Sequence, residues 1–280
     1  MNRGEIAWSA VYETVDQLID TFGLAEPPVD PRGLAKRMGI PVLRFSDIDL
    51  GLLEPALRIR LEHFYGAFLP NPAGGGTIYV REGLSAFKDK DTVSHELGHA
   101  TIRHHREVLL MGWSALTPEL RQILEDEARV FSIVLRLLGD RFDAEAAEFV
   151  YGMETAKFLA DRYALSYEMA LRRYVTIGPP GPILRVFDIH RNWESMDSLA
   201  LKLHYRCFVK PSGGSKLWIP EEPGTSLPPD HPLCAVLPEL RRAEVLVGVP
   251  DTLGRGRCTH EILATQQRLY VLSKPLGWDD

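Results

Sequence analysis

Apolar residues recur every three or four positions through much of the first half of the chain, a spacing that predicts amphipathic helices. The predicted helices cover residues 5–22, 31–38, 87–102, 117–138, 155–163 and 166–175. Short apolar runs between the second and third of these helices predict strands at residues 41–45, 64–69 and 77–81. This part of the chain is therefore expected to be mainly helical, with one small antiparallel sheet.

The pattern changes to alternating apolar and polar positions after the stiff segment Gly178-Pro179-Pro180-Gly181-Pro182. Alternating runs, separated by loops rich in Pro and Gly, predict strands at residues 183–187, 199–209, 245–249, 261–264 and 269–272. The whole chain is thus expected to be an α+β protein in three parts. These are a mainly helical domain at residues 1–150, a helical pair at 151–178 and a sheet domain at 182–280.

The helical pair has the pattern of a helix-turn-helix module. Leu159, Ala160, Ala164 and Ala170 place apolar or small residues where the two helices of such a module pack together. Acidic residues offset much of the basic charge of the pair, so its second helix is not strongly basic. Direct DNA binding and a role in protein contact both stay open for this module.

Composition and charge narrow the class of protein. The chain has 280 residues, of which 45% are hydrophobic and 25% charged, and this suits two or three compact modules. A formal net charge of −6 argues against a protein that binds nucleic acid over its whole surface. The three cysteines are scattered, and no signal peptide or membrane span is expected, so the expected location is the cytoplasm.

The sequence His95-Glu96-Leu97-Gly98-His99 carries the strongest chemical signal in the chain. Residues four apart share one face of a helix, so His95 and His99 can direct their imidazoles at a single metal ion. Glu96 lies beside this pair and suits a general base that takes a proton from water. Flanking apolar residues predict a buried helix, in which such a polar cluster needs a partner. The pattern predicts the active site of a zinc-type peptidase with Glu96 as its catalytic residue.

Several residues are candidates for the third metal ligand. His105 has the spacing of an extended peptidase motif, but that motif has Gly where this chain has Ile102. On a continuous helix His105 would rotate away from the motif, so His104 and His105 are expected to form a solvated helix end. Glu125 lies on the next predicted helix, on a face with small residues, and Glu127 is the runner-up because it falls within the apolar stripe. Either carboxylate would complete a site of two imidazoles and one acid.

Together these residues resemble the ImmA/IrrE-type metallopeptidases. The segment Glu125-Asp126-Glu127-Ala128-Arg129-Val130-Phe131 has the E-x-x-A-x-x-F pattern that follows HELGH in that family. The resemblance implies a zincin-like fold and selects Glu125 as the third ligand of Zn²⁺, with Mn²⁺ as an alternative metal. The chain departs from the family at Arg129 and at Arg136-Leu137-Leu138-Gly139, outside the three expected ligands.

The segment Gly224-Thr225-Ser226-Leu227-Pro228-Pro229-Asp230-His231-Pro232-Leu233 resembles the deinococcal IrrE/PprI group, which regulates radiation resistance and stress response. Members of this group add a helix-turn-helix module and a GAF-like sensor domain to the peptidase, which would account for residues 151–178 and 182–280. The resemblance implies a site-specific endopeptidase that cleaves a helix-turn-helix repressor of the XRE/DdrO type. Such cleavage would switch on stress or DNA-damage-response genes, and the GAF-like domain would receive an unidentified small-molecule signal.

The sequence leaves the substrate contacts and two other functions open. The strand at residues 77–81 either is internal to the sheet or pairs with an extended peptide through Tyr79 and Val80. Tyr65, Tyr79 and His104 are candidates for stabilising the oxyanion. The other functions are an ImmA-like protease that acts on a mobile-element repressor and a non-proteolytic, DNA-binding transcriptional regulator.

Overall fold

The structure of the chain is a computed structural model that describes the following residues. They are residues 3–48, 51, 64–72, 74–112, 115–179, 181–191, 199–208, 224, 226–227, 232–235, 245–250, 258–265 and 267–275. The chain divides into two compact units, Met1–Phe142 with Arg162–Leu165 and Asp143–Asp161 with Ser166–Asp280. Most of the helical pair therefore belongs to the same unit as the C-terminal sheet.

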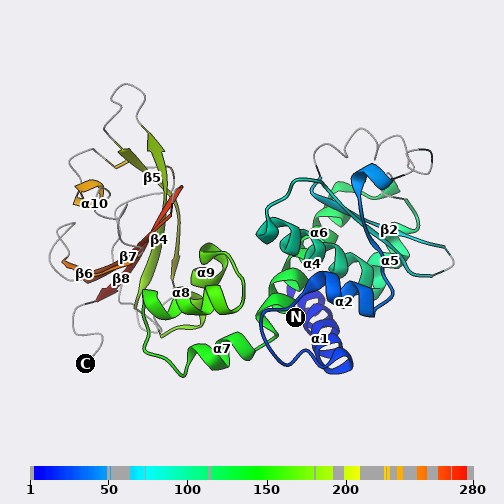
Figure 1. Cartoon of the computed structure of the whole chain (residues 1–280), viewed down its shortest axis with the longest axis horizontal. Coiled ribbons are helices and arrows are strands. Elements are labelled where there is room, and N and C mark those ends of the chain that lie inside the picture. The colour runs from blue at the N-terminus through cyan, green and yellow to red at the C-terminus, as the bar shows by residue number, and fades with distance from the viewer. Residues whose placement is uncertain are drawn as a thin grey trace. The chain divides into compact units, whose positions relative to one another are not determined.

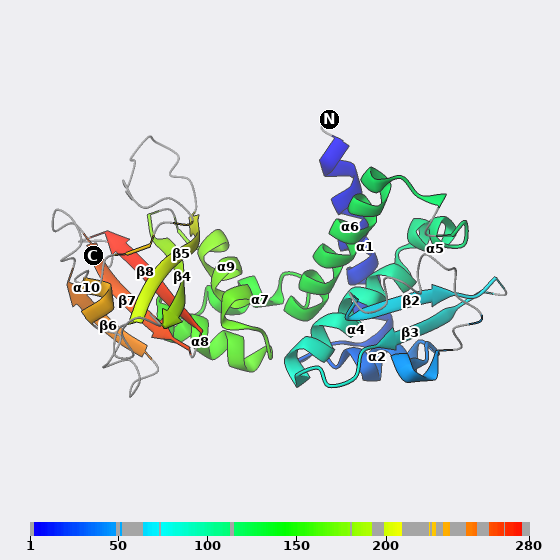
Figure 2. The same cartoon turned by 90° about the horizontal axis from the view of Figure 1, so that it is seen from above.

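The first unit combines helices with a three-stranded sheet (Figure 1). Its elements are α1 (Arg3–Phe22), α2 (Pro31–Arg37), β1 (Val42–Arg44), η1 (Phe45–Asp47), β2 (Gly66–Pro70), β3 (Gly76–Val80), α4 (Ala86–Thr101), α5 (Arg103–Leu109) and α6 (Pro118–Leu137). Helix α4 packs against the sheet and against α6, while α1 packs on α6 (Figure 2). The metal motif thus lies on the central helix of this unit.

Side-chain caps begin both helices that carry the candidate metal ligands, α4 and α6. The hydroxyl of Ser85 accepts a hydrogen bond from the N–H of Lys88 at 3.2 Å and so caps α4. Thr117 caps α6 in the same way, through the N–H of Leu120 at 3.3 Å, and Pro118 occupies the first turn. Short polar side chains therefore define both helix starts.

Helix α4 ends sharply at Ile102, whereas the solvated helix end expected for His104 and His105 requires the helix to continue past this residue. Ile102 has extended backbone angles of φ −67° and ψ 115°, and its N–H still bonds to the carbonyl of Gly98 at 3.0 Å. The chain then starts α5 at Arg103. This change of direction, and not a continuous helix, decides where His104 and His105 lie.

The small sheet has the order β1-β3-β2 and is mixed, because β1 runs parallel to β3 and β2 runs antiparallel to it. The expectation of a purely antiparallel sheet is therefore wrong. Strand β3 is paired along both edges, so of the two alternatives for residues 77–81 the structure shows the internal strand and not a free edge for a peptide. Among the described strands of this sheet, β2 is paired on one side only, and β2 packs on α4.

The second unit is built on a five-stranded sheet of order β5-β4-β8-β7-β6, in which every pair is antiparallel. Its elements are α7 (Arg141–Ala146), α8 (Met153–Arg162), α9 (Tyr167–Ile177), β4 (Ile183–Arg191), β5 (Leu199–Phe208), α10 (Pro232–Ala235), β6 (Val245–Pro250), β7 (Cys258–Ala264) and β8 (Arg268–Pro275). Helix α9 packs against β4 and β5, and an apolar core that includes Phe187 and Val271 lies on the sheet together with Leu233 of α10. The α+β class is confirmed for the chain as a whole.

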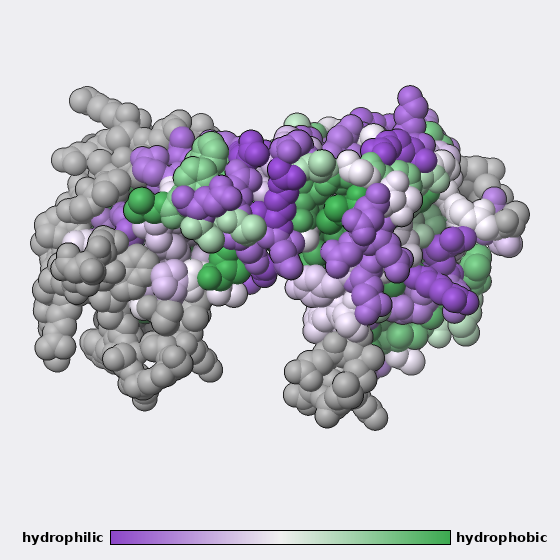
Figure 3. Space-filling model, turned by 90° about the horizontal axis from the view of Figure 1, so that it is seen from below, coloured by the Kyte–Doolittle hydropathy of each residue, from purple (hydrophilic) through white to green (hydrophobic). Residues whose placement is uncertain are grey.

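Some expectations for this unit fall partly outside the described residues. Of the segment Gly224–Leu233, which carried part of the family resemblance, residues 225 and 228–231 lie outside them. No helix among the described residues is long and apolar enough to cross a membrane. On the face drawn in Figure 3, hydrophobic residues form separate patches that hydrophilic residues interrupt.

Candidate metal centre

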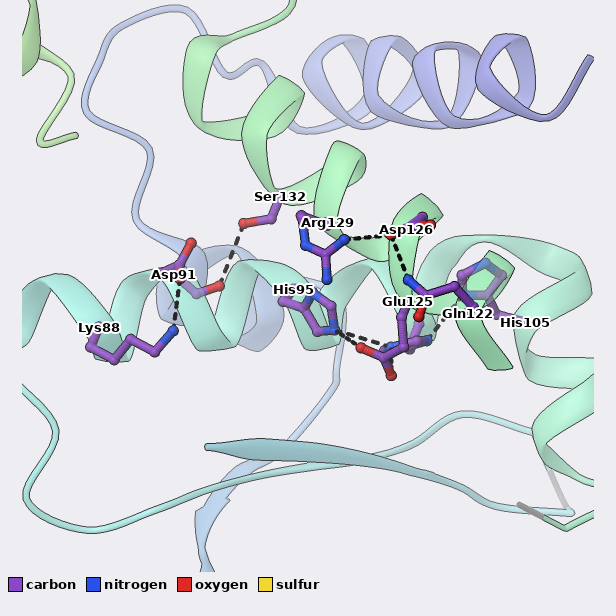
Figure 4. A network of polar contacts seen from close by, with 10 residues as sticks. Lys88, Asp91, His95, His105, Gln122, Glu125, Asp126, Arg129 and Ser132 are labelled. Atoms are coloured by element: carbon purple, nitrogen blue, oxygen red, sulfur yellow. Dashed lines mark hydrogen bonds and ion pairs between the residues drawn. The ribbon is translucent and has the colours of Figure 1, made fainter. Parts of the chain in front are cut away.

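Three side chains from two helices converge at the middle of the first unit. His95 and His99 lie one turn apart on α4, with their Nε2 atoms 3.3 Å from each other. Glu125 of α6 places Oε2 at 3.2 Å from His95 Nε2 and Oε1 at 3.6 Å from His99 Nε2. In Figure 4 the side chains of His95 and Glu125 point toward each other from their two helices. The structure thus brings together the three residues that the sequence predicts as metal ligands.

The two helices approach closely enough for this contact because Gly98 has no side chain. A Cβ atom at residue 98 would lie 3.1 Å from the Cα of Ala128 and 3.1 Å from Cδ1 of Phe131. Both distances are shorter than ordinary carbon–carbon contacts of about 3.5–4.0 Å. Glycine on α4 and alanine on α6 therefore set the separation at which Glu125 reaches the imidazoles.

The spacing of the three donor groups fits a metal ion. Ligands about 2.0–2.1 Å from a tetrahedral zinc ion lie roughly 3.3–3.4 Å from one another. The observed separations of 3.2, 3.3 and 3.6 Å lie around this value. Two imidazoles and one carboxylate are also the donor set of a catalytic zinc site, in which one position stays open for water or substrate.

The pKa of Glu125 and the pKa of His95 depend on each other, because the two groups form a hydrogen bond. Burial raises the pKa of Glu125, but hydrogen bonds from His95 and His99 outweigh burial and lower it overall. Burial lowers the pKa of His95, but the hydrogen bond to Glu125 and the charges of Glu96, Glu125 and Asp91 raise it overall. Protons and a cation would therefore compete for the same nitrogen and oxygen atoms.

Glu96 is close to the three converging groups but has a separate environment. Its side chain is buried against β2, where a Cβ atom at Gly66 would lie 2.9 Å from Glu96 Oε1. The backbone N–H of Phe68 donates a hydrogen bond to the Glu96 carboxylate. Burial raises the pKa of Glu96, although the nearby imidazoles oppose the shift. A raised pKa suits a group that must take up a proton during a reaction.

A second cluster of titratable groups lies next to the first. Glu127 Oε2 is 2.6 Å from His104 Nε2 and 2.6 Å from His105 Nε2, and His105 Nδ1 is 3.0 Å from His99 Nδ1. The side chain of His105 is 0% exposed, whereas that of His104 is 46% exposed. Burial lowers the pKa of His105 to about 2, and neighbouring imidazoles add to the effect.

The position of His105 corrects the expectation of a solvated helix end. Because α4 breaks at Ile102, the first turn of α5 brings His105 back against the rear of His99 instead of rotating it into solvent. The signal in the sequence was Glu127, an acid within an apolar stripe that needs a buried partner. His105 is that partner, together with the partly exposed His104.

The other candidate residues have the following surroundings. Val80 is fully buried, and Tyr79 lies on the internal strand β3, so neither residue lies on a free edge. Tyr65 is 52% exposed and lies under the ammonium group of Lys88 at 4.5 Å. Among the oxyanion candidates, His104 directs Nε2 at Glu127.

Arg136, where the chain departs from the family pattern, has a structural position that the sequence did not reveal. Its side chain is buried and lies over the ring of Phe87 at 4.6 Å. It also contacts Asp91 of α4 at 3.4 Å and donates to the carbonyl of Ala164 at 2.7 Å. Arg136 therefore ties α6 to α4 on the side of Asp91, which also accepts a hydrogen bond from Ser132 through its carbonyl (Figure 4).

Fold and site together define a metallopeptidase-type protein, and the comparison of sequences gives its family. The profile of the peptidase M78 family, described as the IrrE N-terminal-like domain, matches residues 35–174. The chain belongs to this family, so the resemblance to the ImmA/IrrE-type metallopeptidases is confirmed. No curated protein matches the chain significantly.

A solved structure extends the likeness in fold beyond the matched segment. A transcriptional regulator from Mycobacterium tuberculosis aligns over 96% of this chain and 76% of its own, with a TM-score of 0.52. The two sequences are 14% identical, so this likeness concerns the fold alone.

Proposed function

We propose that the chain is a metal-dependent, site-specific endopeptidase that cleaves a helix-turn-helix transcriptional repressor of the XRE/DdrO type. The observation that carries this proposal is the convergence of His95, His99 and Glu125 at separations of 3.2–3.6 Å, with the buried Glu96 beside them. Membership of the IrrE N-terminal-like family supports a peptidase reaction at this site.

His95, His99 and Glu125 would hold the metal, Zn²⁺ or Mn²⁺. A divalent cation held there would supply a Lewis acid for the scissile carbonyl and would lower the pKa of the attacking water. Glu96 takes the proton from this water and passes it to the leaving amine. Its raised pKa makes it a competent proton acceptor, and the N–H of Phe68 holds the carboxylate in place.

The substrate is proposed to lie in an extended conformation along β2. This strand is paired with β3 on one edge only among the described strands, and it packs on the helix that carries the motif. An extended peptide can add to such an edge through main-chain hydrogen bonds. Because Gly66 lets β2 approach Glu96, a peptide on this edge would pass close to the proposed general base.

A regulatory role with a narrow choice of substrate is proposed, because the chain has a second compact unit in addition to the peptidase domain. Helices α8 and α9 with the five-stranded sheet make up most of this unit, in which the proposed helix-turn-helix module and GAF-like sensor would lie. The unit would receive a signal or contact the repressor, and cleavage would switch on stress or DNA-damage-response genes in the cytoplasm.

The proposal is tested by incubating the protein with candidate helix-turn-helix repressors in the presence of Zn²⁺ or Mn²⁺. We expect one specific pair of fragments, identified by mass spectrometry, from the wild type and none from Glu96→Gln. The matched control is Glu107→Gln, because the Glu107 side chain is 64% exposed on α5, and it should cleave like the wild type. Equal regulation by the wild type and Glu96→Gln, with no fragments from either, would instead show a non-proteolytic regulator.

A further inference from the structure

Nδ1 of His99, the ring nitrogen that is not directed at His95, contacts a buried series of polar side chains. His99 Nδ1 lies 3.0 Å from His105 Nδ1, and His105 Nε2 lies 2.6 Å from Glu127 Oε2. The side chains of His105 and Glu127 are 0% and 4% exposed. These contacts therefore run from the proposed metal ligand into the core as far as Glu127, whose carboxylate the partly exposed His104 also contacts.

The distances distinguish this cluster from a second metal site. His104, His105 and Glu127 place three possible ligand atoms together, as His95, His99 and Glu125 do. Ligands of one zinc ion would lie about 3.3–3.4 Å apart, whereas both nitrogens here lie 2.6 Å from the same oxygen. A charge-assisted N–H···O⁻ hydrogen bond is about 2.7–2.9 Å long, which is close to the observed 2.6 Å. The second cluster is thus hydrogen-bonded, while the first has the spacing of a metal site.

With Glu127 ionised and His105 neutral, the order of donors and acceptors along these contacts implies where each proton lies. A carboxylate only accepts, so His105 Nε2 carries the proton that is shared with Glu127. The second nitrogen of a neutral ring is an acceptor, so His105 Nδ1 accepts from His99 Nδ1–H. His99 then has its lone pair on Nε2, the atom that lies 3.3 Å from His95 Nε2. Its lone pair thus faces the proposed metal position.

We propose that His105 and Glu127 are positioning residues that hold His99 in the tautomer and ring orientation required to bind the metal. This inference rests on the proposed metal site but goes beyond it, because it assigns a function to two residues outside the ligand set. Hydrogen bonds from a ligating histidine to an acceptor behind it commonly have this effect. The break of α4 at Ile102 makes the arrangement possible, because α5 then brings His105 behind the motif.

Zinc affinity of three variants, measured by competition with a chromophoric chelator, tests the proposal without any peptide substrate. His105→Leu removes both hydrogen bonds and should weaken zinc binding by about 10–100-fold. His105→Gln keeps one acceptor and one donor and should recover most of the affinity. The matched control is His104→Leu, which loses a bond to the same Glu127 oxygen but does not contact His99, and it should bind zinc like the wild type.

The outcomes separate this proposal from the metal site on which it rests. Zinc binding by the wild type with unchanged affinity in folded His105→Leu would overturn the positioning role and leave the metal site intact. No zinc binding by the wild type would overturn both. A second equivalent of zinc that is lost in His104→Leu would show that the second cluster binds metal, contrary to the proposal.

A measurement on the wild type alone keeps the test independent of variant folding. Long-range ¹H–¹⁵N correlation spectra distinguish the two tautomers of a neutral histidine. We expect His99 as the Nδ1–H tautomer and His105 as the Nε2–H tautomer in the metal-free protein. His99 protonated on Nε2 and bare on Nδ1 would contradict the proposed order of donors.

Discussion

At the scale of single residues, the three glutamates in and beside the candidate metal centre have three different environments. Glu125 contacts the two imidazoles of the motif, Glu127 contacts the histidines behind it, and Glu96 is buried beside β2. The same carboxylate chemistry can therefore serve as ligand, positioning group and general base. All three residues are glutamates, so the different roles proposed for them follow from their different surroundings.

Replacing Glu125 by Gln tests the ligand assignment. The variant keeps the size of the side chain but removes its charge, and loss of a direct ligand should cost more than the roughly 10–100-fold typical of residues behind a ligand. We expect zinc affinity, measured by chelator competition, to fall by more than about 100-fold. Asp126→Asn is the matched control, because Asp126 contacts Gln122 and Arg129 at the surface. Equal losses in both variants would refute a specific role of Glu125.

The contact between Arg32 and Asp89 makes a prediction about pH. A hydrogen bond from Arg32 lowers the pKa of Asp89 below its ordinary value, and burial opposes this only partly. Because the pKa is lower in the folded state, the contact stabilises the fold above the unfolded pKa of about 3.9. The stabilisation is lost as the pH falls through the lower, folded pKa.

Asp89→Asn should therefore lower the free energy of unfolding at about pH 7 by up to roughly 1 kcal/mol, since the pair is partly exposed. The difference between variant and wild type should shrink as the pH approaches about 3. Urea unfolding followed over this range measures it. A difference that grew toward low pH would have the wrong sign for this contact.

At the scale of elements, the sequence predicts the position of most helices and strands. The spacing of apolar residues predicts helices at residues 87–102 and 117–138, which agree with α4 and α6 to within a few residues, and Ser85 and Thr117 cap these helices in the structure. The shared face of Glu125 and Ala128 also predicts which side of α6 meets α4. Local capping and periodicity carry this information, so a single sequence is enough.

Two features of the site could not be predicted, because they depend on the chain beyond its local pattern. The extended conformation of Ile102 reverses the expected exposure of His105, and a β-branched residue alone does not indicate a helix break. The strand order β1-β3-β2 makes β3 internal and β2 an edge strand, although β3 precedes the metal helix in the sequence. Strand order arises from pairing between distant segments, which periodicity does not encode.

Gly98 allows a test of the packing between α4 and α6. Gly98→Ala gains about 1 kcal/mol of helix propensity but meets Ala128 and Phe131 at 3.1 Å, so the two effects should nearly cancel. Gly98→Val should lower the free energy of unfolding by about 1–3 kcal/mol through overpacking. It should also weaken zinc binding, because a wider helix spacing withdraws Glu125 from His95. Thermal unfolding and chelator competition measure the two effects, and a Gly98→Val variant with unchanged zinc affinity would contradict this explanation.

At the scale of the whole molecule, the second unit has a polar anchor of its own. Glu261 accepts a hydrogen bond from the N–H of Met153 at 2.5 Å and pairs with Lys274 at 2.7 Å. Lys274 also donates to the carbonyl of Tyr151 at 2.7 Å. Both charged side chains are nearly buried, so each needs the opposite charge of the other to offset its loss of hydration. The anchor joins the start of α8 to the five-stranded sheet.

Replacing one charged residue of this pair should therefore lower the free energy of unfolding more than replacing both. Glu261→Met leaves Lys274 buried without its counter-charge and should lower the free energy of unfolding of this unit by about 3–5 kcal/mol. Adding Lys274→Met should recover part of that loss. Urea unfolding of the wild type, both single variants and the double variant measures the coupling, with zinc affinity as a check on the first unit. A double variant less stable than Glu261→Met would refute the buried pair as the cause.

The central claim is that one divalent cation binds between His95, His99 and Glu125. The most direct test is a crystal structure of the protein grown with zinc, with anomalous scattering recorded at the zinc absorption edge. We expect a single strong peak within bonding distance of both Nε2 atoms and the Glu125 carboxylate, with Glu96 outside the coordination sphere. A peak between His104, His105 and Glu127 instead, or no peak beside the motif, would contradict it.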